Sequence, residues 1–388
     1  MTLAKIPLII VGDAPTQPTG LARIARDLAE LIVTGFDDRV DLHYVGYQPA
    51  GGAWAGWNGN YPLWTFSDLK GWGAPMVSRV MQILEAHGAS PGIVWPIWDA
   101  DRAYELAGPG VLRDWQLWVY PAIDAVDQNN TFFGPGRAAI KRADRVAAYG
   151  SWSAGILSGM TKTIVPALPH GLHDPWYDIA PSPNPDGITR IGCVATNQGR
   201  KDLPLFFKTL KILSERGRAV QGWLHTNQLL GAYSVNGLIA TNRLSAREVQ
   251  ITVSGPETTD QWLRTMYRSC DITLGVGRGE GFGYPAVESM ACGVPHLAVD
   301  YAGGAELLPV EWRVEPGAWY VDGLYSVRRP LVPAGRLADR VEAVLRQSDR
   351  AEVARQAAAP YHWTRHGLQQ RWYEWIKYGL DELGADRG

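Results

Sequence analysis

The sequence predicts an α/β fold made of two doubly wound domains. Short apolar runs alternate with amphipathic helical stretches, which indicates parallel sheets covered on both faces. The chain has 388 residues, too many for one ordinary core. A segment rich in Pro, Asp and Asn at residues 178–190 interrupts the alternation and is typical of a linker. We therefore expect two Rossmann-like domains facing a central cleft, because open α/β sheets bind ligands at the carboxyl ends of their strands.

The individual elements follow from apolar runs and helical spacing. In the first half, strands are expected at residues 6–13, 40–47, 92–98, 116–123 and 145–150, a helix at 19–33, and a long loop at 51–75. In the second half, strands are expected at 190–195, 220–227, 248–255, 271–277 and 295–300, and helices at 203–217, 258–270, 285–293, 335–349 and 362–383.

Composition and charge limit the classes of binding partner and the cellular compartment that we expect for this chain. The 37 Lys and Arg against 39 Asp and Glu give a net charge of −2, which lowers the expectation of nucleic-acid binding. The opening apolar run is too short to span a bilayer, so no membrane segment is expected. The three cysteines are far apart in the sequence and favour a reducing compartment, so the expected setting is cytoplasmic.

Seventeen tryptophans are an unusual feature of this composition. Trp54, Trp57, Trp64 and Trp72 lie close together in a stretch rich in Gly and Asn. Two interpretations stay open. The rings fill a core, or they form a loop whose flat faces stack on a sugar ring or a base.

Two acidic residues follow a predicted strand within the sequence "GRGEGFGYPAVESM" at residues 277–290. Glu280 lies in a glycine-rich turn, which lets the backbone approach a ligand closely and point amides at its oxygens. Glu288 lies on the helix that begins near Pro285. Two carboxylates so placed suit the hydroxyls of a nucleotide-activated sugar. The alternative is an ordinary strand–turn–helix in which Glu288 is a surface residue.

The region around this turn resembles the E-x7-E signature of the retaining GT-B glycosyltransferases, the glycogen-synthase-like or group 1 family. The resemblance rests on "GEGFGYPAVESMACGVPHLAVDYAGGAEL" and on the preceding "TTDQWLRTMYRSCDITLGVG". It extends to "LPHGLHD" at 168–174, to "ATNQGRKDLPLFFKTLKIL", and to "YHWTRHGLQQRWYEWI". The last of these resembles the family's C-terminal helix, which crosses back onto the first domain. Together these matches cover roughly residues 165–380.

The resemblance implies roles for the acidic residues and the turn. Glu280 would hold hydroxyls of the donor sugar and Glu288 would hold the ribose. The turn of Gly281, Phe282, Gly283 and Tyr284 would present backbone amides to the sugar and phosphates.

The resemblance also implies a basic pair on the diphosphate, since two cations can neutralise this leaving group without a metal. Lys201 stands at the family's lysine position, whereas Thr196 stands where an arginine is usual. Arg200 is expected to compensate, and Asn197 in the same loop is expected to contact the donor. Alternatively, Arg200 and Lys201 are solvated residues at the start of a helix.

The N-terminal "GDAPTQPTGLARIARDL" resembles the family's first glycine loop, with Gly12 and Gly20 as the expected close-approach points to the donor. Asp13 and Thr19 are alternatively simple turn and cap residues. The family's histidine near the reacting sugar is absent here. Asp124 is a candidate to replace it as a base or hydrogen-bond acceptor for the incoming hydroxyl, or is a turn residue.

Two further features have a functional and a plain interpretation. His170 in the interdomain "PHG" either contacts ligand or is a hinge residue. Asp99 and Asp101 form a DxD pattern, which binds metal in GT-A transferases but can equally cap a helix. We expect no metal.

The sequence thus predicts a retaining, metal-independent glycosyltransferase that uses a nucleotide sugar, with UDP- or GDP-sugars favoured and no other cofactor. The expected domains are residues 1–175 on the acceptor side, 186–358 for the nucleotide sugar, and 359–388 as the returning helix. The acceptor is a hydroxyl on a glycan, a lipid-linked intermediate or a small molecule. A phage-type enzyme acting on hydroxymethylated DNA bases and a degenerate, non-catalytic binding protein are the alternatives.

Overall fold

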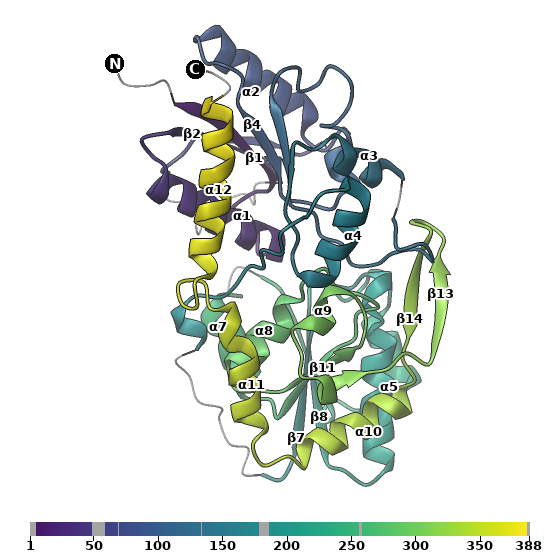
Figure 1. Cartoon of the computed structure of the whole chain (residues 1–388). Helices are drawn as coiled ribbons and strands as arrows, with labels where there is room; N and C mark the ends of the chain where they lie inside the picture. The colour runs from purple at the N-terminus through teal and green to yellow at the C-terminus, as the bar shows by residue number, and fades with distance from the viewer. Residues whose placement is uncertain are drawn as a thin grey trace. The chain divides into compact units, whose positions relative to one another are not determined.

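A computed structural model describes residues 5–48, 59–68, 70–132, 134–177, 186–255 and 258–385. The chain divides into two compact units, each built around its own sheet (Figure 1). Unit 1 comprises Met1–His170 and Gln369–Gly388, and unit 2 comprises Gly171–Leu368. Trp54, Trp57 and most of the predicted linker, at 178–185, lie outside the described residues.

Unit 1 contains a six-stranded parallel sheet with the strand order of Rossmann folds. In spatial order its strands are β3 (Leu63–Phe66), β2 (Val40–Tyr47), β1 (Ile6–Asp13), β4 (Ile93–Pro96), β5 (Gln116–Val119) and β6 (Arg145–Val146). The order reverses between β1 and β4, so the loops after these strands diverge to opposite faces and leave a crevice.

The helices of unit 1 cover this sheet. They are α1 (Gly20–Gly35), α2 (Ala74–Ala86), α3 (Gly134–Arg142) and α4 (Ser151–Thr161), together with α12 (Leu368–Ala385) from Gln369 onward. The predicted long loop at 51–75 is wrong in part, because it contains β3 and the first residues of α2. The four residues of β3 are all half-buried, so the strand carries no clear alternation of apolar and polar positions.

The last helix, α12 (Leu368–Ala385), packs within unit 1 from Gln369 onward. Its residues Trp372, Ile376 and Leu380 are fully buried. The indole of Trp372 lies 6.0 Å from that of Trp95 and 4.7 Å from the ring of Tyr120. The returning C-terminal helix expected for this fold class is therefore present.

Unit 2 repeats the same architecture with a second six-stranded parallel sheet. In spatial order its strands are β12 (Arg313–Val314), β11 (His296–Val299), β10 (Ile272–Gly275), β7 (Thr189–Val194), β8 (Val220–Thr226) and β9 (Val249–Val253). Here the order reverses between β7 and β10, so the loops that follow these two strands flank the crevice.

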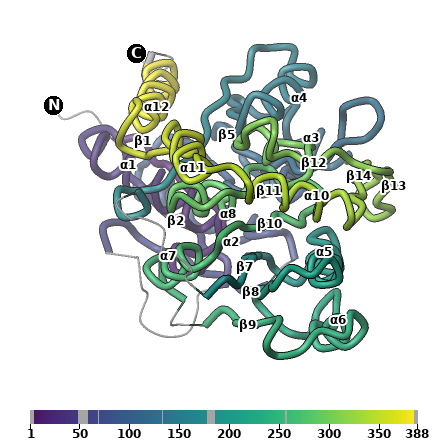
Figure 2. The backbone as a smooth tube through the Cα atoms, turned by 90° about the horizontal axis from the view of Figure 1, so that it is seen from below, coloured from purple at the N-terminus to yellow at the C-terminus, as the bar shows by residue number. Residues whose placement is uncertain are grey.

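The helices of unit 2 are α5 (Leu203–Glu215), α6 (Val235–Thr241), α7 (Asp260–Arg268), α8 (Tyr284–Ala291), α9 (Ala302–Glu306), α10 (Ala334–Leu345) and α11 (Arg350–Ala358). Helix α6 lies beside α5 (Figure 2). A separate antiparallel hairpin is formed by β13 (Ala318–Asp322) and β14 (Val327–Leu331). The α/β prediction holds in both halves, whereas α6, α9, α11 and this hairpin were not expected.

We predict that Trp372→Ala lowers the free energy of unfolding by about 3–5 kcal/mol, the usual cost of removing a large buried aromatic side chain. The indole is fully buried among aromatic rings of unit 1, so its loss leaves a cavity. Lys377→Ala, on the exposed face of the same helix, serves as the control and should change stability by less than about 0.5 kcal/mol. Urea unfolding followed by tryptophan fluorescence measures both, and equal effects would contradict the packing described.

Candidate active site

The glycine-rich turn after β10 holds Glu280 close to the crevice of unit 2. The turn enters α8 through Gly283, which has a left-handed backbone with φ of +99° and is the residue preceding the helix. The backbone oxygen of Glu280 accepts a hydrogen bond of 3.0 Å from the amide of Gly304. The side chains of Phe282 and Tyr284 are buried, so these residues can offer a ligand their backbone groups.

Two glycines of α9 are required by the close packing of this helix against the turn. A Cβ atom on Gly303 would lie 2.1 Å from the backbone oxygen of Gly281. One on Gly304 would lie 2.9 Å from the Cβ of Glu280. The "GGAEL" segment therefore supports the turn from behind and fixes the backbone of Glu280.

Glu280 forms ion pairs with both predicted cations. The Nζ of Lys201 contacts its Oε1, and an Nη of Arg200 lies 3.5 Å from its Oε2. Burial opposes ionisation of Glu280, but the charges of Lys201 and Arg200 outweigh it and hold the pKa of this carboxyl below its usual value. The sequence prediction of these three residues in one site is consistent with this geometry.

The two cations reach Glu280 because they lie in the loop after β7, the strand next to β10 in the sheet. A short 3-10 turn at Gly199–Lys201 carries them, and Asp202 follows with a left-handed backbone (φ +33°). This loop and the turn of Glu280 leave neighbouring strands at the same edge of the sheet, as the switch point requires.

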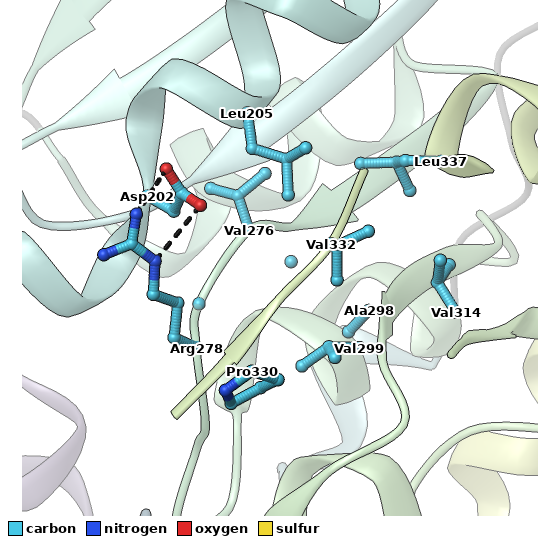
Figure 3. Close-up of a pocket in the computed structure, with 12 residues that line it drawn as sticks. Asp202, Leu205, Val276, Arg278, Ala298, Val299, Val314, Pro330, Val332 and Leu337 are labelled. Atoms are coloured by element: carbon cyan, nitrogen blue, oxygen red, sulfur yellow. Dashed lines mark hydrogen bonds and ion pairs between the residues drawn. The ribbon is translucent and has the colours of Figure 1, made fainter. Parts of the chain in front are cut away.

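Arg278 joins the two loops, and sequence reasoning missed this role. Its guanidinium binds the carboxylate of Asp202 through two contacts of 2.9 and 3.1 Å (Figure 3). Its amide donates to the backbone oxygen of Arg200 over 2.8 Å. The side chain also donates to the hydroxyl of Tyr320 on β13 over 3.2 Å. Arg278 lies within the recognised motif, but only the fold shows that Asp202 is its partner.

Apolar side chains line a small pocket next to this ion pair. Figure 3 shows Val276 and Leu205 on the side of Asp202, and Leu337 across the pocket from them. The ion pair thus has an apolar base on one side and the loop carrying Lys201 on the other. Such a partly buried, bidentate pair fixes geometry more firmly than an exposed one.

A pocket in unit 2 opens beside Glu280. Its lining includes Lys201, Glu280 and Gly283, the first turn of α8, and His296 on β11. Glu288 is not among the residues that line it. The pocket therefore presents one carboxylate, one ammonium group and an imidazole on a wall of small side chains.

Glu288 lies deeper than its predicted partner Glu280. Only 4% of it is exposed, and its Oε2 accepts a hydrogen bond of 2.7 Å from the hydroxyl of Tyr267 on α7. The alternative interpretation of Glu288 as an ordinary surface residue is wrong. The bonded, buried position follows from α8 packing against α7.

The other two residues predicted in the β7 loop differ in environment. Thr196 is exposed, and its backbone oxygen accepts a bond of 2.9 Å from Gln198. Asn197 is buried, and its side-chain amide bonds the backbone of Gln228 and Tyr233. The side chain of Asn197 therefore holds the loop after β8, and its contact with a donor stays a prediction.

In unit 1, the predicted first glycine loop begins at the end of β1. Gly12 pairs in register with Gly46 of β2, and Gly20 is the first residue of α1. Thr19 caps that helix by accepting from the amide of Ala22 over 3.0 Å, and it donates to Asp13 over 2.7 Å. The plain interpretation accounts for Thr19 as a cap, whereas Asp13 also accepts a bond of 3.0 Å from the indole nitrogen of Trp98.

Asp124 and His170 also lie in unit 1. Asp124 is half-buried in the loop after β5. His170 is 2% exposed, and its Nδ1 is 2.8 Å from the hydroxyl of Tyr120. Burial lowers the pKa of His170 well below its usual value, with a further contribution from Arg23, so the imidazole is neutral near pH 7.

The remaining candidates have structural contacts. Asp99 pairs with Arg102 at 3.4 Å, and no group of three or more His, Cys, Asp or Glu residues among those described is arranged to hold a metal ion.

Trp64 and Trp72 pack against the core of unit 1, which favours the core-filling interpretation for these two rings. No helix in the described ranges is both long and apolar enough to cross a bilayer.

Comparisons with known proteins agree with this fold. Residues 242–311, which include the turn of Glu280, match the family model of Glycosyl transferases group 1. No curated protein matches the chain in sequence.

Solved structures match over nearly the whole chain. Sucrose-phosphate synthase from Thermosynechococcus elongatus has a TM-score of 0.71 at 14% identity, covering 98% of this chain and 100% of its own. The lipopolysaccharide outer core galactosyltransferase WaaB has 0.66 at 12%, covering 96% and 99%. A structure described as trehalose-6-phosphate from E. coli bound with UDP-2-fluoro glucose has 0.65 at 14%, covering 96% and 98%. The predicted GT-B fold and the resemblance to group 1 glycosyltransferases are confirmed, the latter over residues 242–311.

Proposed function

We propose that this protein is a retaining glycosyltransferase that moves a sugar from a nucleotide sugar to an acceptor hydroxyl. The observation that carries the proposal is the contact of Glu280 with Lys201 and Arg200 beside the pocket of unit 2. A carboxylate for hydroxyls and two cations for phosphates are the groups that a nucleotide sugar requires. Among the similar structures, one is described as bound with UDP-2-fluoro glucose, which supports this class of donor.

The two cations have a defined task in this proposal. Breaking the bond between the anomeric carbon and the phosphate oxygen leaves negative charge on the diphosphate, and Lys201 and Arg200 stabilise it. Both cations contact Glu280 in the structure. Donor binding therefore exchanges partners: the cations turn to the phosphates, and the carboxylate turns to sugar hydroxyls.

The turn and the second carboxylate complete the donor site. The backbone of Gly281, Phe282, Gly283 and Tyr284 offers amides to the sugar and phosphates, because the two aromatic side chains are buried. We assign the ribose to Glu288, whose carboxylate is oriented by the hydroxyl of Tyr267.

The transfer step needs no nucleophile from the protein. The acceptor oxygen attacks the anomeric carbon on the face from which the diphosphate departs, so the anomeric configuration is retained. The hydroxyl proton passes to an oxygen of the leaving phosphate, or to Asp124 if that carboxylate serves as the base. The products are the glycosylated acceptor and a nucleoside diphosphate.

We assign the acceptor side to unit 1 and the donor side to unit 2, with the domain limits 1–175, 186–358 and 359–388.

A modified-DNA acceptor is not favoured, because the net charge is −2 and Trp64 and Trp72 pack on the core. A non-catalytic role is disfavoured by the intact contacts of Glu280. The buried free thiols of Cys193, Cys270 and Cys292 favour a cytoplasmic setting.

The proposal is tested with a panel of UDP-, GDP- and ADP-glucose and GDP-mannose. We expect one of these donors to raise the melting temperature and to be hydrolysed slowly to its nucleoside diphosphate in the absence of acceptor. Proton NMR of the first-released sugar should show the anomeric configuration of the donor. Absence of both binding and release with every donor would leave the non-catalytic alternative, and an inverted product would refute retention.

Glu280→Gln should reduce kcat/KM for the donor by roughly 10- to 150-fold, because a hydrogen bond to a charged group contributes about 1.5–3 kcal/mol. The amide keeps the shape of the side chain but removes the charge that the two cations face. Glu215→Gln, at an exposed carboxylate on α5, is the matched control. A Glu280→Gln enzyme as active as this control would contradict the assigned role.

Lys201→Met should move the acidic limb of the kcat/KM profile to higher pH. In the wild type, Lys201 and Arg200 hold the pKa of Glu280 below its usual value, so its carboxylate stays ionised as the pH falls through the ordinary range of glutamate. Removing Lys201 raises that pKa, and activity is lost earlier on acidification. Lys211→Met, at a helix surface, should leave the limb in place; an unchanged limb in Lys201→Met would contradict the coupling.

A further inference from the structure

His296 is one of the residues that line the pocket beside Glu280 and Lys201. It is the first residue of β11, and it pairs in register with Thr273 of β10. Only 4% of the residue is exposed. Sequence reasoning assigned it no role, since it stands in an apolar strand where nothing marks it as functional.

A chain of hydroxyls fixes the imidazole on one side. Its Nδ1 is 2.8 Å from the Oγ1 of Thr273. That oxygen is 2.6 Å from the hydroxyl of Ser289 on α8, which donates to the backbone oxygen of Val294 over 2.9 Å. The ring is therefore held in one orientation by the sheet and by the helix that follows the Glu280 turn.

The opposite edge of the ring reaches Gly275, next to the pocket. A Cβ on Gly275 would lie 2.6 Å from Nε2 of His296, so the glycine makes room for the imidazole. Gly275 also lines the pocket. Nδ1 is thus held by Thr273, and Nε2 lies on the side of the ring where a ligand is expected.

The charge of the His296 imidazole decides whether it can bind a phosphate or a hydroxyl of a nucleotide sugar. Burial lowers the pKa of His296 to about 4, although Glu280 opposes this shift. The imidazole is therefore neutral near pH 7. A phosphate would be served by a cation, and Lys201 and Arg200 already supply two. A neutral ring nitrogen suits an uncharged hydroxyl, with which it exchanges an ordinary hydrogen bond.

We propose that His296 is a specificity-determining residue whose Nε2 hydrogen-bonds a hydroxyl of the donor sugar, on the side opposite Glu280. This inference rests on the proposed function and deepens it. Glu280 and His296 would hydrogen-bond two different hydroxyls. A charged group and a neutral group would thus together select the orientation of the sugar ring. Discrimination between epimeric sugars would then depend in part on His296.

The test uses two variants that separate the nitrogens of the ring. His296→Asn places an amide near the position of Nδ1 and keeps the bond to Thr273, but loses the group facing the pocket. His296→Gln extends an amide to the position of Nε2. The probe is whichever of UDP-glucose, GDP-glucose, ADP-glucose and GDP-mannose the wild type binds, and a wild type that binds none of the four counts against the proposed function before any variant is made.

We expect His296→Asn to weaken binding of the nucleotide sugar about tenfold, as for the loss of one hydrogen bond. Binding of the matching nucleoside diphosphate should change less than twofold, and His296→Gln should restore most of the affinity for the nucleotide sugar. Calorimetry measures both ligands, and melting temperatures show that the variants fold. Equal weakening of both ligands, or no weakening in His296→Asn, would overturn the proposal while leaving the glycosyltransferase assignment intact.

A second substitution tests whether the imidazole of His296 occupies the space beside Gly275. Gly275→Ala should destabilise the wild type, because its Cβ would overlap Nε2, and should be better tolerated beside His296→Asn, whose shorter side chain leaves space. A double-mutant cycle on the melting temperatures measures this coupling. Additive effects would contradict the contact between Gly275 and His296 on which the inference depends.

Discussion

The geometry of the candidate site depends first on the bidentate ion pair between Arg278 and Asp202. Asp202 begins the helix after the cationic turn, and Arg278 begins the turn that holds Glu280. Besides this pair, the amide of Arg278 donates to the backbone oxygen of Arg200, and the side chain of Arg200 donates to the backbone oxygen of Gly279 over 3.4 Å. The ion pairs of Lys201 and Arg200 with Glu280 join the same two loops. The left-handed backbone of Asp202, a strained conformation for a residue with a side chain, is the local cost of bringing its carboxylate to Arg278.

The topology explains why these two loops are neighbours, since they follow the adjacent strands β7 and β10. In unit 2 the strand order reverses between β7 and β10, so the segments that follow the two strands separate to opposite faces and leave a crevice between them. Cations come from one side of this crevice and a carboxylate from the other. The sheet of unit 1 reverses in the same way between β1 and β4, where Thr19 and Asp13 occupy the corresponding loop with contacts of their own.

The sequence was sufficient for the fold class and for the residues around Glu280, since buried parallel strands are continuous apolar runs and a glycine-rich turn between strand and helix is distinctive. It could not identify Arg278 as a link or His296 as a pocket residue, because both depend on partners distant in sequence, Asp202 and Gly275. The short β3 was missed because its half-buried residues show no alternation. Asn197 was placed in the correct loop, but its side chain supports the backbone at Gln228 and Tyr233.

The unliganded site already contains the charge pattern that a nucleotide sugar would meet. Lys201 and Arg200 against Glu280 leave one net positive charge, while Arg278 and Asp202 cancel each other. In the proposed function, a diphosphate would draw the two cations away from Glu280 and leave its half-buried carboxylate without these partners. Sugar hydroxyls would then supply new ones. A free nucleoside diphosphate would not, so the sugar's contribution to binding should include relief of an unpaired carboxylate. The proposed exchange of partners would thus couple recognition of the sugar to stabilisation of its leaving group.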